Sequence, residues 1–312
     1  MHKFNEVFSI HSQSVFLTQR SLNNFFYMIL IVDSGSTKSD WVLIKNGEHH
    51  SYSTMGLNPY FHDEDTVYNA VHGNPGLNEA SLEVERVYFY GAGCSAPHLN
   101  DVIRRGLKRL FVNAEVSVDH DLTACAYATY EGAPSISCII GTGSNSCYYD
   151  GKSVSEVVPA LGYILGDEGS GSYFGKKLLS NYLYHRLPED ISNVLKNEMG
   201  LTKDIIVERV YMTPNANVYL ASFMPFITRF AEHPYIQEMV YEGFRHFIDI
   251  HVCCYPNYRD VKTHFVGSIA QIFEKQLIDA CHSLDVQMGS IIRKPIEGLV
   301  SYHENHLKVL KS

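Results

Sequence analysis

The chain has 312 residues, of which 45% are hydrophobic and 19% charged, a balance that is typical of globular proteins and sufficient for two domains with cores of their own. Its formal net charge is −9, with 34 acidic residues against 25 Lys and Arg. An acidic chain without a basic block argues against binding to nucleic acid or to an anionic membrane, but it allows a local site for a phosphorylated small molecule.

The seven cysteines do not form a recognisable framework. Their number is odd and no CxxC pair occurs, which argues against a disulfide scaffold or a zinc ribbon and favours buried thiols in a reducing cytoplasm. No apolar segment is long enough to span a bilayer.

Residues 1–27 lack the continuous apolar stretch and small-residue cleavage site of a signal peptide. Met28 stands immediately before the first strand pattern. We therefore expect Met28 to be the natural start, with residues 1–27 an extension outside the fold.

The first elements form a hairpin. An apolar run over 28–33 ends at Asp33, a polar turn follows, and a second apolar run covers 39–44. Asn46-Gly47 is typical of a two-residue hairpin turn, so a third strand is expected near 48–53. The patterns that follow predict a strand over 84–90, a helix over 101–111 capped by Asn100 or Asp101, a strand over 114–121, and a helix over 122–130.

The same order of elements then returns. A strand over 135–140 leads into a glycine and hydroxyl turn over 141–146, and a strand with an Asp-Gly hairpin turn follows. This weak repeat predicts two similar α/β domains that face each other, over residues 28–133 and 134–293.

The remaining sequence is mostly helical in pattern. Residues 170–254 have expected breaks at Pro188, Gly200, Pro214 and Pro234. After them we expect a strand entering a glycine turn over 263–270, an amphipathic helix over 271–284, and a closing helix over 294–308 with Pro295 in its first turn, packed on the first domain.

The turn after the first strand has the composition of an anion site. Backbone N–H groups and hydroxyls of Ser34, Gly35, Ser36 and Thr37 can converge, and Lys38 adds a positive charge. Asp33 has the wrong sign for a phosphate, but it is suitable if Mg²⁺ bridges the carboxylate and the phosphate. The alternative is an ordinary turn with Asp33 as its cap. No Walker A loop is present, and GAGCSA (91–96) is a poor dinucleotide motif because no acidic residue follows at the required distance.

Four motifs in order, DSGSTKSDW, GTGSN, LGDEGSG and VGSIA, carry a family resemblance. The chain resembles the BadF/BadG-type ATPases of the sugar kinase, Hsp70 and actin superfamily, and within it the N-acetylglucosamine kinases. The resemblance runs from Met28 to about Leu307. It implies two ribonuclease-H-like domains with ATP in the cleft between them, Mg²⁺ as cofactor, an amino sugar as substrate and, by analogy, a homodimer as an assembly to test.

The resemblance also implies the residues that bind Mg-ATP. Asp33 resembles the family's magnesium-linked acid, and Ser36, Thr37 and Lys38 resemble its first phosphate loop. Further residues that resemble phosphate- or nucleotide-binding positions are Gly141, Thr142, Gly143 and Ser144 in the second loop, and Gly267 and Ser268 in the adenosine turn.

Asp121 resembles the family's catalytic aspartate, which would orient the acceptor hydroxyl and take its proton. A helix N-cap is the competing role for this residue, and the spacing does not exclude Asp119 as the catalytic acid.

Asn58, Asn145 and Asp167 resemble sugar-binding residues, and Asp and Asn side chains suit the recognition of sugar hydroxyls. The competing roles are an Asx turn at Asn58 and a helix cap at Asp167. Residues 91–94 are expected near the sugar, although the sequence departs there from the kinases that it resembles.

The best interpretation of the sequence is a kinase that transfers the γ-phosphate of ATP to the 6-hydroxyl of N-acetylglucosamine. A kinase for glucosamine or another amino sugar remains open, and it would require a further carboxylate near the 2-position. Two further functions also remain open: a dehydratase-activating ATPase with an iron–sulfur cluster, and a non-catalytic regulator that binds ATP or a sugar.

Overall fold

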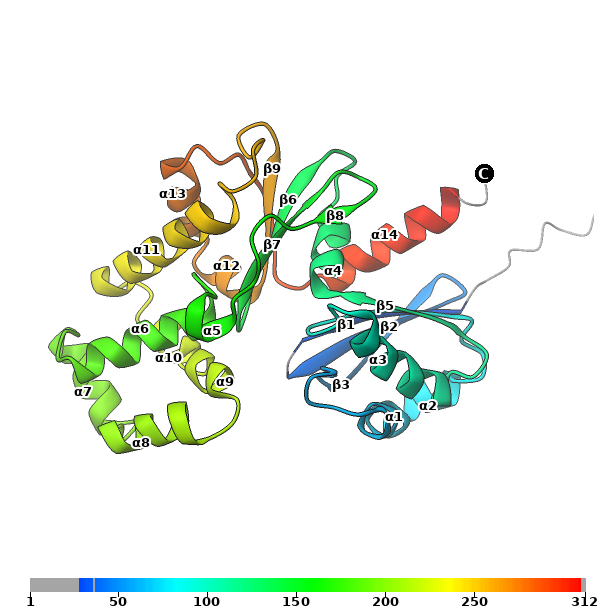
Figure 1. The fold of residues 1–312 in the computed structure, drawn as a ribbon, viewed down its shortest axis with the longest axis horizontal. Helices are drawn as coiled ribbons and strands as arrows, with labels where there is room; N and C mark the ends of the chain where they lie inside the picture. Colours follow the sequence, from blue (N-terminus) through cyan, green and yellow to red (C-terminus); the bar gives the residue numbers. More distant parts are fainter. Residues whose placement is uncertain (1–27, 36, 310–312) are drawn as a thin grey trace, which may run out of the picture.

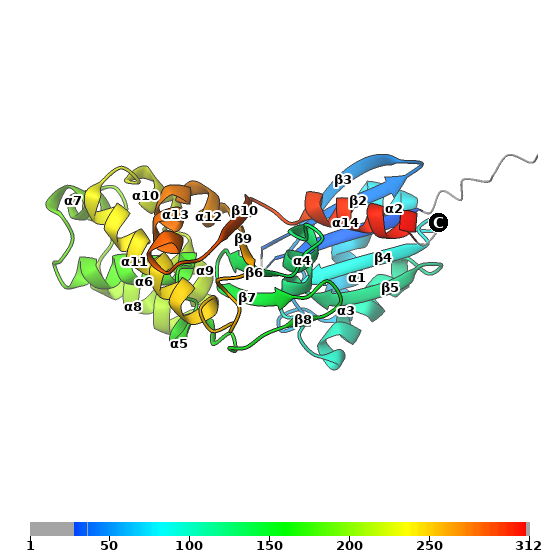
Figure 2. The ribbon, with the colours of Figure 1, turned by 90° about the horizontal axis from the view of Figure 1, so that it is seen from above.

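The computed structural model describes residues 28–35 and 37–309, and the proposed extension 1–27 lies outside them. Two five-stranded mixed sheets lie side by side and form the frame of the molecule (Figures 1 and 2). The first sheet has the order β3-β2-β1-β4-β5, and its strands are β1 (Ile29–Ser34), β2 (Lys38–Lys45), β3 (Glu48–Met55), β4 (Arg86–Gly91) and β5 (Glu115–His120).

The second sheet repeats this topology, with the order β10-β9-β6-β7-β8. In both sheets the first strand pairs antiparallel with the second and parallel with the fourth. The strands are β6 (Ser135–Ile140), β7 (Ser144–Tyr149), β8 (Val154–Ser155), β9 (Lys262–Val266) and β10 (Met288–Ile292). The repeat predicted from the sequence is therefore present as topology.

Alternation along β1 explains how the first sheet is covered. Leu30 and Val32 face a core that includes residues of α1 (Glu64–His72), α2 (Pro75–Ala80) and α3 (Pro97–Leu110). Ile29 and Ile31 face the other side, toward α4 (Asp121–Ala128) and α14 (Ile296–Val309). Figure 1 shows α14 above this sheet and α1 and α3 below it. We call residues 28–128 together with α14 the N-terminal half.

The C-terminal half, residues 135–292, adds a large helical region to the second sheet (Figure 1, left). Aromatic and aliphatic side chains from several of these helices pack against Ile136, Cys138 and Ile140 of β6. The helical elements are α5 (Gly162–Leu165), α6 (Gly171–Leu183), α7 (Glu189–Asn197), α8 (Lys203–Val207), the π-helical turn η1 (Glu208–Met212), α9 (Ala216–Ala221), α10 (Met224–Arg229), α11 (Pro234–His251), α12 (Ser268–Ile272) and α13 (Glu274–Ser283).

Helix α4 lies between the two sheets. Its Ala124 belongs to the core under β1, whereas Leu122 and Ala126 pack with Cys147 and Tyr149 of β7. The N-terminus of α4 is therefore at a point that both halves can reach.

Most predicted elements are confirmed, but several boundaries differ. Helix α3 begins at Pro97, with Ala96 as its cap, so the predicted caps Asn100 and Asp101 are wrong: proline is favoured in a first turn, where no N–H is needed. Strand β7 begins at Ser144, which shortens the predicted turn 141–146. Within 28–35 and 37–309, no helix is long and apolar enough to cross a membrane.

Candidate active site

Asp33 is the penultimate residue of β1, and its neighbours in the sheet are Asp40 on β2 and Tyr90 on β4. Burial raises the pKa of this carboxyl to about 7, and the charges of Asp121 and Asp40 add to the effect, whereas Lys294 opposes it. Among the described residues, no group forms a hydrogen bond with its carboxylate. Asp33 and Asp121, predicted from distant motifs, are thus close enough to repel each other.

Asp121 is the first residue of α4, and the N-cap is His120 rather than Asp121. The His120 Nδ1 atom lies 3.0 Å from Asp121 Oδ1 and 3.2 Å from the backbone nitrogen of Leu122. Burial lowers the pKa of His120, but the carboxylates of Asp121, Glu156 and Asp119 together outweigh it, so the net pKa is raised. A protonated His120 would donate to Asp121, and a neutral one would accept from the Leu122 N–H group.

Asp119 adjoins His120 but lines a cavity that includes neither His120 nor Asp121. Its Oδ1 accepts a hydrogen bond from the backbone of His120 at 2.7 Å. The side chain lines a cavity of about 520 Å³ together with Tyr90, Tyr127 and Tyr302, near α14. Because Asp121 and not Asp119 acts on the pKa of Asp33, the geometry favours Asp121 as the acid of the site.

The loop after β1 is only partly free to bind an anion. The Ser34 hydroxyl is fully buried, 2.7 Å from the Ser39 hydroxyl, and it accepts from the Leu57 N–H group at 2.9 Å. The Ser34 hydroxyl therefore stabilises the loop through these hydrogen bonds, and it cannot reach a phosphate without breaking them. The Gly35 N–H group donates to the Lys38 carbonyl at 3.0 Å, which closes a tight turn. Thr37 is exposed, and Ser36 lies outside the described residues.

A second lysine joins Lys38 at this loop. Lys38 Nζ lies 2.6 Å from Asp40 Oδ1, and Lys294 Nζ lies 2.6 Å from Asp40 Oδ2. Sequence reasoning missed Lys294, because it is 254 positions from Asp40 and carries no local motif. A bound phosphate would compete with Asp40 for two cations that are already in place.

The second loop, residues 141–143, is held by the segment that contains GDEGS. Asp167 Oδ1 accepts from the Ser144 N–H group at 3.2 Å, and the Ser144 hydroxyl donates to the Glu168 carbonyl at 2.6 Å. The carbonyls of Gly141 and Thr142 accept from the first turn of α6. Thr142 and Gly143 remain partly exposed, so this loop can offer backbone groups to a ligand, whereas the Ser144 hydroxyl is engaged.

The predicted sugar ligands lie on different segments. Asn58 Oδ1 accepts from the Tyr60 N–H group at 3.0 Å, which confirms the Asx turn. A Cβ atom on Gly93 would lie 2.4 Å from that oxygen, so the loop 91–94 packs directly on Asn58. Asn145 is on β7. Burial raises the pKa of Asp167, which has a positive φ of 57° and is not the cap of α6, a position that Ser170 occupies.

Gly267 is the residue between the end of β9 and the start of α12. Its φ is 141°, and a Cβ atom there would lie 1.9 Å from the Ile140 carbonyl oxygen. Only glycine suits such a position. Ser268, the first residue of α12, is exposed.

A buried hydrogen bond between Glu168 and His251 supports the GDEGS segment, and no sequence motif predicts it. Glu168 Oε2 lies 3.3 Å from His251 Nε2, and the Ser146 hydroxyl donates to the His251 carbonyl at 2.5 Å. Burial lowers the pKa of His251, which favours a neutral ring that donates to Glu168. This pair links α11 to the residue that follows Asp167.

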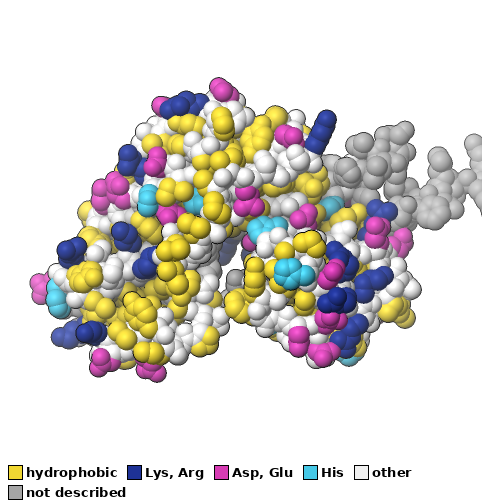
Figure 3. Space-filling model, viewed as in Figure 1, with side chains coloured by type: hydrophobic (Ala, Val, Ile, Leu, Met, Phe, Trp, Pro, Cys, Tyr) yellow, Lys and Arg dark blue, Asp and Glu magenta, His cyan; other side chains and the backbone are white. Residues whose placement is uncertain are grey.

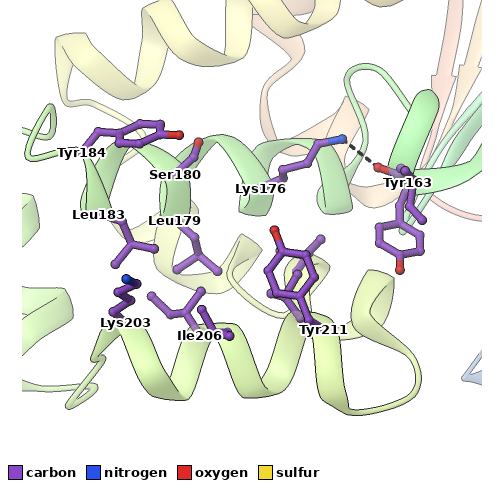
Figure 4. A pocket seen from close by; sticks show the side chains of 13 residues that line it. Tyr163, Lys176, Leu179, Ser180, Leu183, Tyr184, Lys203, Ile206 and Tyr211 are labelled. Carbon is purple, nitrogen blue, oxygen red and sulfur yellow. Dashed lines mark hydrogen bonds between the residues drawn. The ribbon is translucent and has the colours of Figure 1, made fainter.

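An apolar groove of about 420 Å³ lies apart from the acidic residues, between α6 and the α8–η1 segment (Figure 4). Leu179, Leu183 and Ile206 point into it, and Lys176 Nζ donates to the Tyr163 carbonyl at 2.7 Å. None of its lining residues is acidic, so it lacks a group for Mg²⁺ or for a catalytic base.

The carboxylates at Asp33 suit Mg²⁺ bound through few protein ligands better than a metal held by three or more protein side chains. No group of three or more His, Cys, Asp or Glu residues suited to a metal occurs within the described part of the chain. Mg²⁺ commonly binds through one carboxylate, phosphates and water, and Asp33 offers such a carboxylate beside a second one. Five cysteines are buried, so their thiols are not at the surface to hold an iron–sulfur cluster between two subunits: Cys94, Cys125, Cys138, Cys147 and Cys281.

A hollow opens between the two halves on the face shown in Figure 3, and acidic and histidine side chains gather at its upper end. Helix α4 and the two sheets meet in this region.

No model of a known protein family matches the chain, and no curated protein matches it. Among solved structures, a proposed N-acetylglucosamine kinase from Porphyromonas gingivalis is 36% identical, with a TM-score of 0.84 over 89% of this chain and 99% of that one. A proposed N-acetylglucosamine kinase from Chromobacterium violaceum is 15% identical, with a TM-score of 0.65 over 89% and 99% of the two chains.

A ROK family glucokinase from Streptomyces griseus, solved with glucose and AMPPNP, is 13% identical, with a TM-score of 0.51 over 89% and 98% of the two chains. At such low identity, the Streptomyces griseus and Chromobacterium violaceum proteins have only the sugar kinase fold in common with this chain. The Porphyromonas gingivalis protein is similar to this chain in sequence over nearly its whole length. The chain belongs to the family of ATP-dependent carbohydrate kinases that includes the Porphyromonas gingivalis protein.

Proposed function

We propose that the protein transfers the γ-phosphate of ATP to the 6-hydroxyl of N-acetylglucosamine. The observation that carries the proposal is the 36% identity to the Porphyromonas gingivalis protein over 89% of the chain. We assign the chain to the BadF/BadG-type branch of the superfamily, with ribonuclease-H-like domains over 28–133 and 134–293. The catalytic site lies between them, with α14 packed on the first.

Asp121 is the general base in this proposal. Phosphoryl transfer depends mainly on positioning and on the stabilisation of charge, and a carboxylate beside the acceptor hydroxyl orients it and takes its proton late. The position of Asp121 at the N-terminus of α4, between the two sheets, supports this role. The contact with His120 would orient the Asp121 carboxylate.

The phosphates would lie between the loop after β1 and the loop 141–143. Lys38 and Lys294 would move from Asp40 to the phosphate oxygens, and Asp33 would hold Mg²⁺, which neutralises phosphate charge when bound. Gly267 and Ser268 would border the adenosine. Asn58, Asn145 and Asp167 would bind the sugar, and closure of the halves would exclude water from the reacting phosphate.

The proposal is tested by ADP release in a coupled assay with Mg-ATP. The acceptors are N-acetylglucosamine, glucosamine, N-acetylmannosamine and glucose, with a reaction without sugar as the blank. Asp121→Asn is compared with Asp119→Asn, a matched control on the neighbouring strand. We expect release only with N-acetylglucosamine, a loss of roughly 10²- to 10⁴-fold in kcat for Asp121→Asn, and near-normal activity for Asp119→Asn.

A preference for glucosamine would keep the mechanism and overturn the substrate. Turnover without any sugar would contradict the kinase proposal and favour an energy-coupling ATPase. Sugar binding without ADP release would favour a regulator.

A further inference from the structure

Glu156 follows β8 and is exposed, yet its carboxylate is fixed from one side. Asn145 Nδ2 donates to Glu156 Oε2 at 3.1 Å. The other end of the same amide is also engaged, because Asn145 Oδ1 accepts from the Ser146 N–H group at 2.8 Å. Asn145 is 9% exposed and cannot rotate without losing both bonds, so it is a rigid partner that restrains Oε2 of the Glu156 carboxylate.

The Glu156 carboxylate lies beside the N-terminus of α4. Strand β8 pairs with β7 and packs against α4. The Cys147 thiol of β7 lies 3.5 Å from the Leu122 carbonyl, in the first turn of this helix. The charge of Glu156 contributes to the raised pKa of His120, together with Asp121 and Asp119, so these acidic groups surround one small region.

The second oxygen of the Glu156 carboxylate is available to a ligand. Among the residues that the structure describes, no donor forms a hydrogen bond with Oε1, and no cation is paired with the carboxylate. The Glu156 carboxylate therefore contacts the predicted sugar ligand Asn145 and lies near the predicted base Asp121. Its free oxygen is placed to accept a hydrogen bond from a bound sugar.

We propose that Glu156 is a specificity-determining residue whose free oxygen accepts a hydrogen bond from the sugar, from a hydroxyl or an amide N–H group other than the hydroxyl that is phosphorylated. This inference rests on the proposed kinase function. Asn145, a sugar ligand in the proposed function, then also positions the Glu156 carboxylate. The arrangement favours sugars with a donor at this position and disfavours anionic sugars, because the carboxylate would repel them.

The test compares Glu156→Ala and Glu156→Gln with Glu79→Gln, which changes an exposed glutamate on α2. For each protein we would measure sugar affinity by calorimetry and the KM values for sugar and for ATP. We expect Glu156→Ala to weaken sugar binding and raise the sugar KM roughly ten- to a hundredfold, since a hydrogen bond to a charged group is lost. Glu156→Gln should lose less, because its amide oxygen still accepts. The KM for ATP should be unchanged in both Glu156 variants. In Glu79→Gln, the sugar affinity and both KM values should be unchanged.

Deoxy analogues of the sugar then identify the contact. Removal of the hydroxyl or amide N–H that Glu156 binds should weaken binding to the natural protein but not weaken it further in Glu156→Ala. Unchanged sugar affinity in Glu156→Ala, or equal penalties for every analogue in both proteins, would overturn the inference. A natural protein that binds and phosphorylates no sugar would instead overturn the proposed function, and the inference with it.

Discussion

Asp33 is held in the folded chain at an electrostatic cost. Its pKa is raised from 3.8 to about 7, first by burial and then by Asp121 and Asp40. The folded protein therefore retains a proton that the unfolded chain releases, and the free energy of unfolding falls as pH rises between about 4 and 7. At about 1.4 kcal/mol per pH unit, the loss amounts to at most about 4 kcal/mol.

Replacement of Asp33 by Asn should remove this cost. In protein stripped of divalent metal, we expect Asp33→Asn to be more stable than the natural protein, with an advantage that grows from pH 5 to pH 7 and is constant above pH 8. Urea denaturation at each pH measures it. Asp279→Asn, a change at an exposed aspartate on α13, serves as the control and should show no such trend. A constant difference across the pH range would contradict the raised pKa.

At the scale of elements, two glycines with positive φ distinguish a required position from a tolerated one. A Cβ atom on Gly267 would lie 1.9 Å from the backbone of β6, whereas one on Gly200, with a φ of 59°, would meet nothing within 4 Å. We expect Gly267→Ala to cost more than about 3 kcal/mol, because strain and overlap add, and Gly200→Ala to cost about 1 kcal/mol.

Thermal unfolding of the two glycine variants, monitored by circular dichroism, measures this contrast. Equal costs would mean that the junction of β9 and α12 can relax, and that the glycine is not needed for the close approach of β6.

The sequence predicted the elements whose residues carry a strong local pattern. Strand β1 was evident from its apolar run, and the hairpin of β2 and β3 from Asn46-Gly47. Helix α1 was missed because only Val67 and Val71 are buried in it. Strand β10 was missed because all its residues are only half-buried and its pairing with β9 shifts register, so neither alternation nor a continuous apolar run marks it.

The candidate site was predictable to the same extent. Asp33 and Asp121 follow the rule that polar residues at strand ends meet at one edge of a sheet. Lys294 and Glu156 could not be found, because their partners, Asp40 and Asn145, become neighbours only through the tertiary fold. Recognition groups of this kind carry no spacing signal of their own.

At the scale of the whole molecule, the chain crosses between the halves at two neighbouring points. One crossing leads from α4 to β6 and the other from β10 to α14, and the two helices pack together where a Cβ atom on Gly298 would lie 2.3 Å from the Ala128 carbonyl oxygen. Two connections that lie beside one close contact between helices are suited to a hinge. The C-terminal half can rotate relative to the N-terminal half while α4 and α14 stay in contact.

We therefore expect the hollow of Figure 3 to narrow when both substrates bind. Small-angle X-ray scattering should give a smaller radius of gyration with N-acetylglucosamine and a non-hydrolysable ATP analogue together than with either alone, since only both ligands connect the two halves. Gly298→Val, which would separate α14 from α4, should reduce this change. Gly200→Ala, at an exposed loop glycine between α7 and α8 with a φ of 59° and open space around it, is the control and should preserve the change. An unchanged radius with both ligands bound, verified by calorimetry in the same buffer, would mean that the two halves form a rigid frame and that the site excludes water by local loop movement alone.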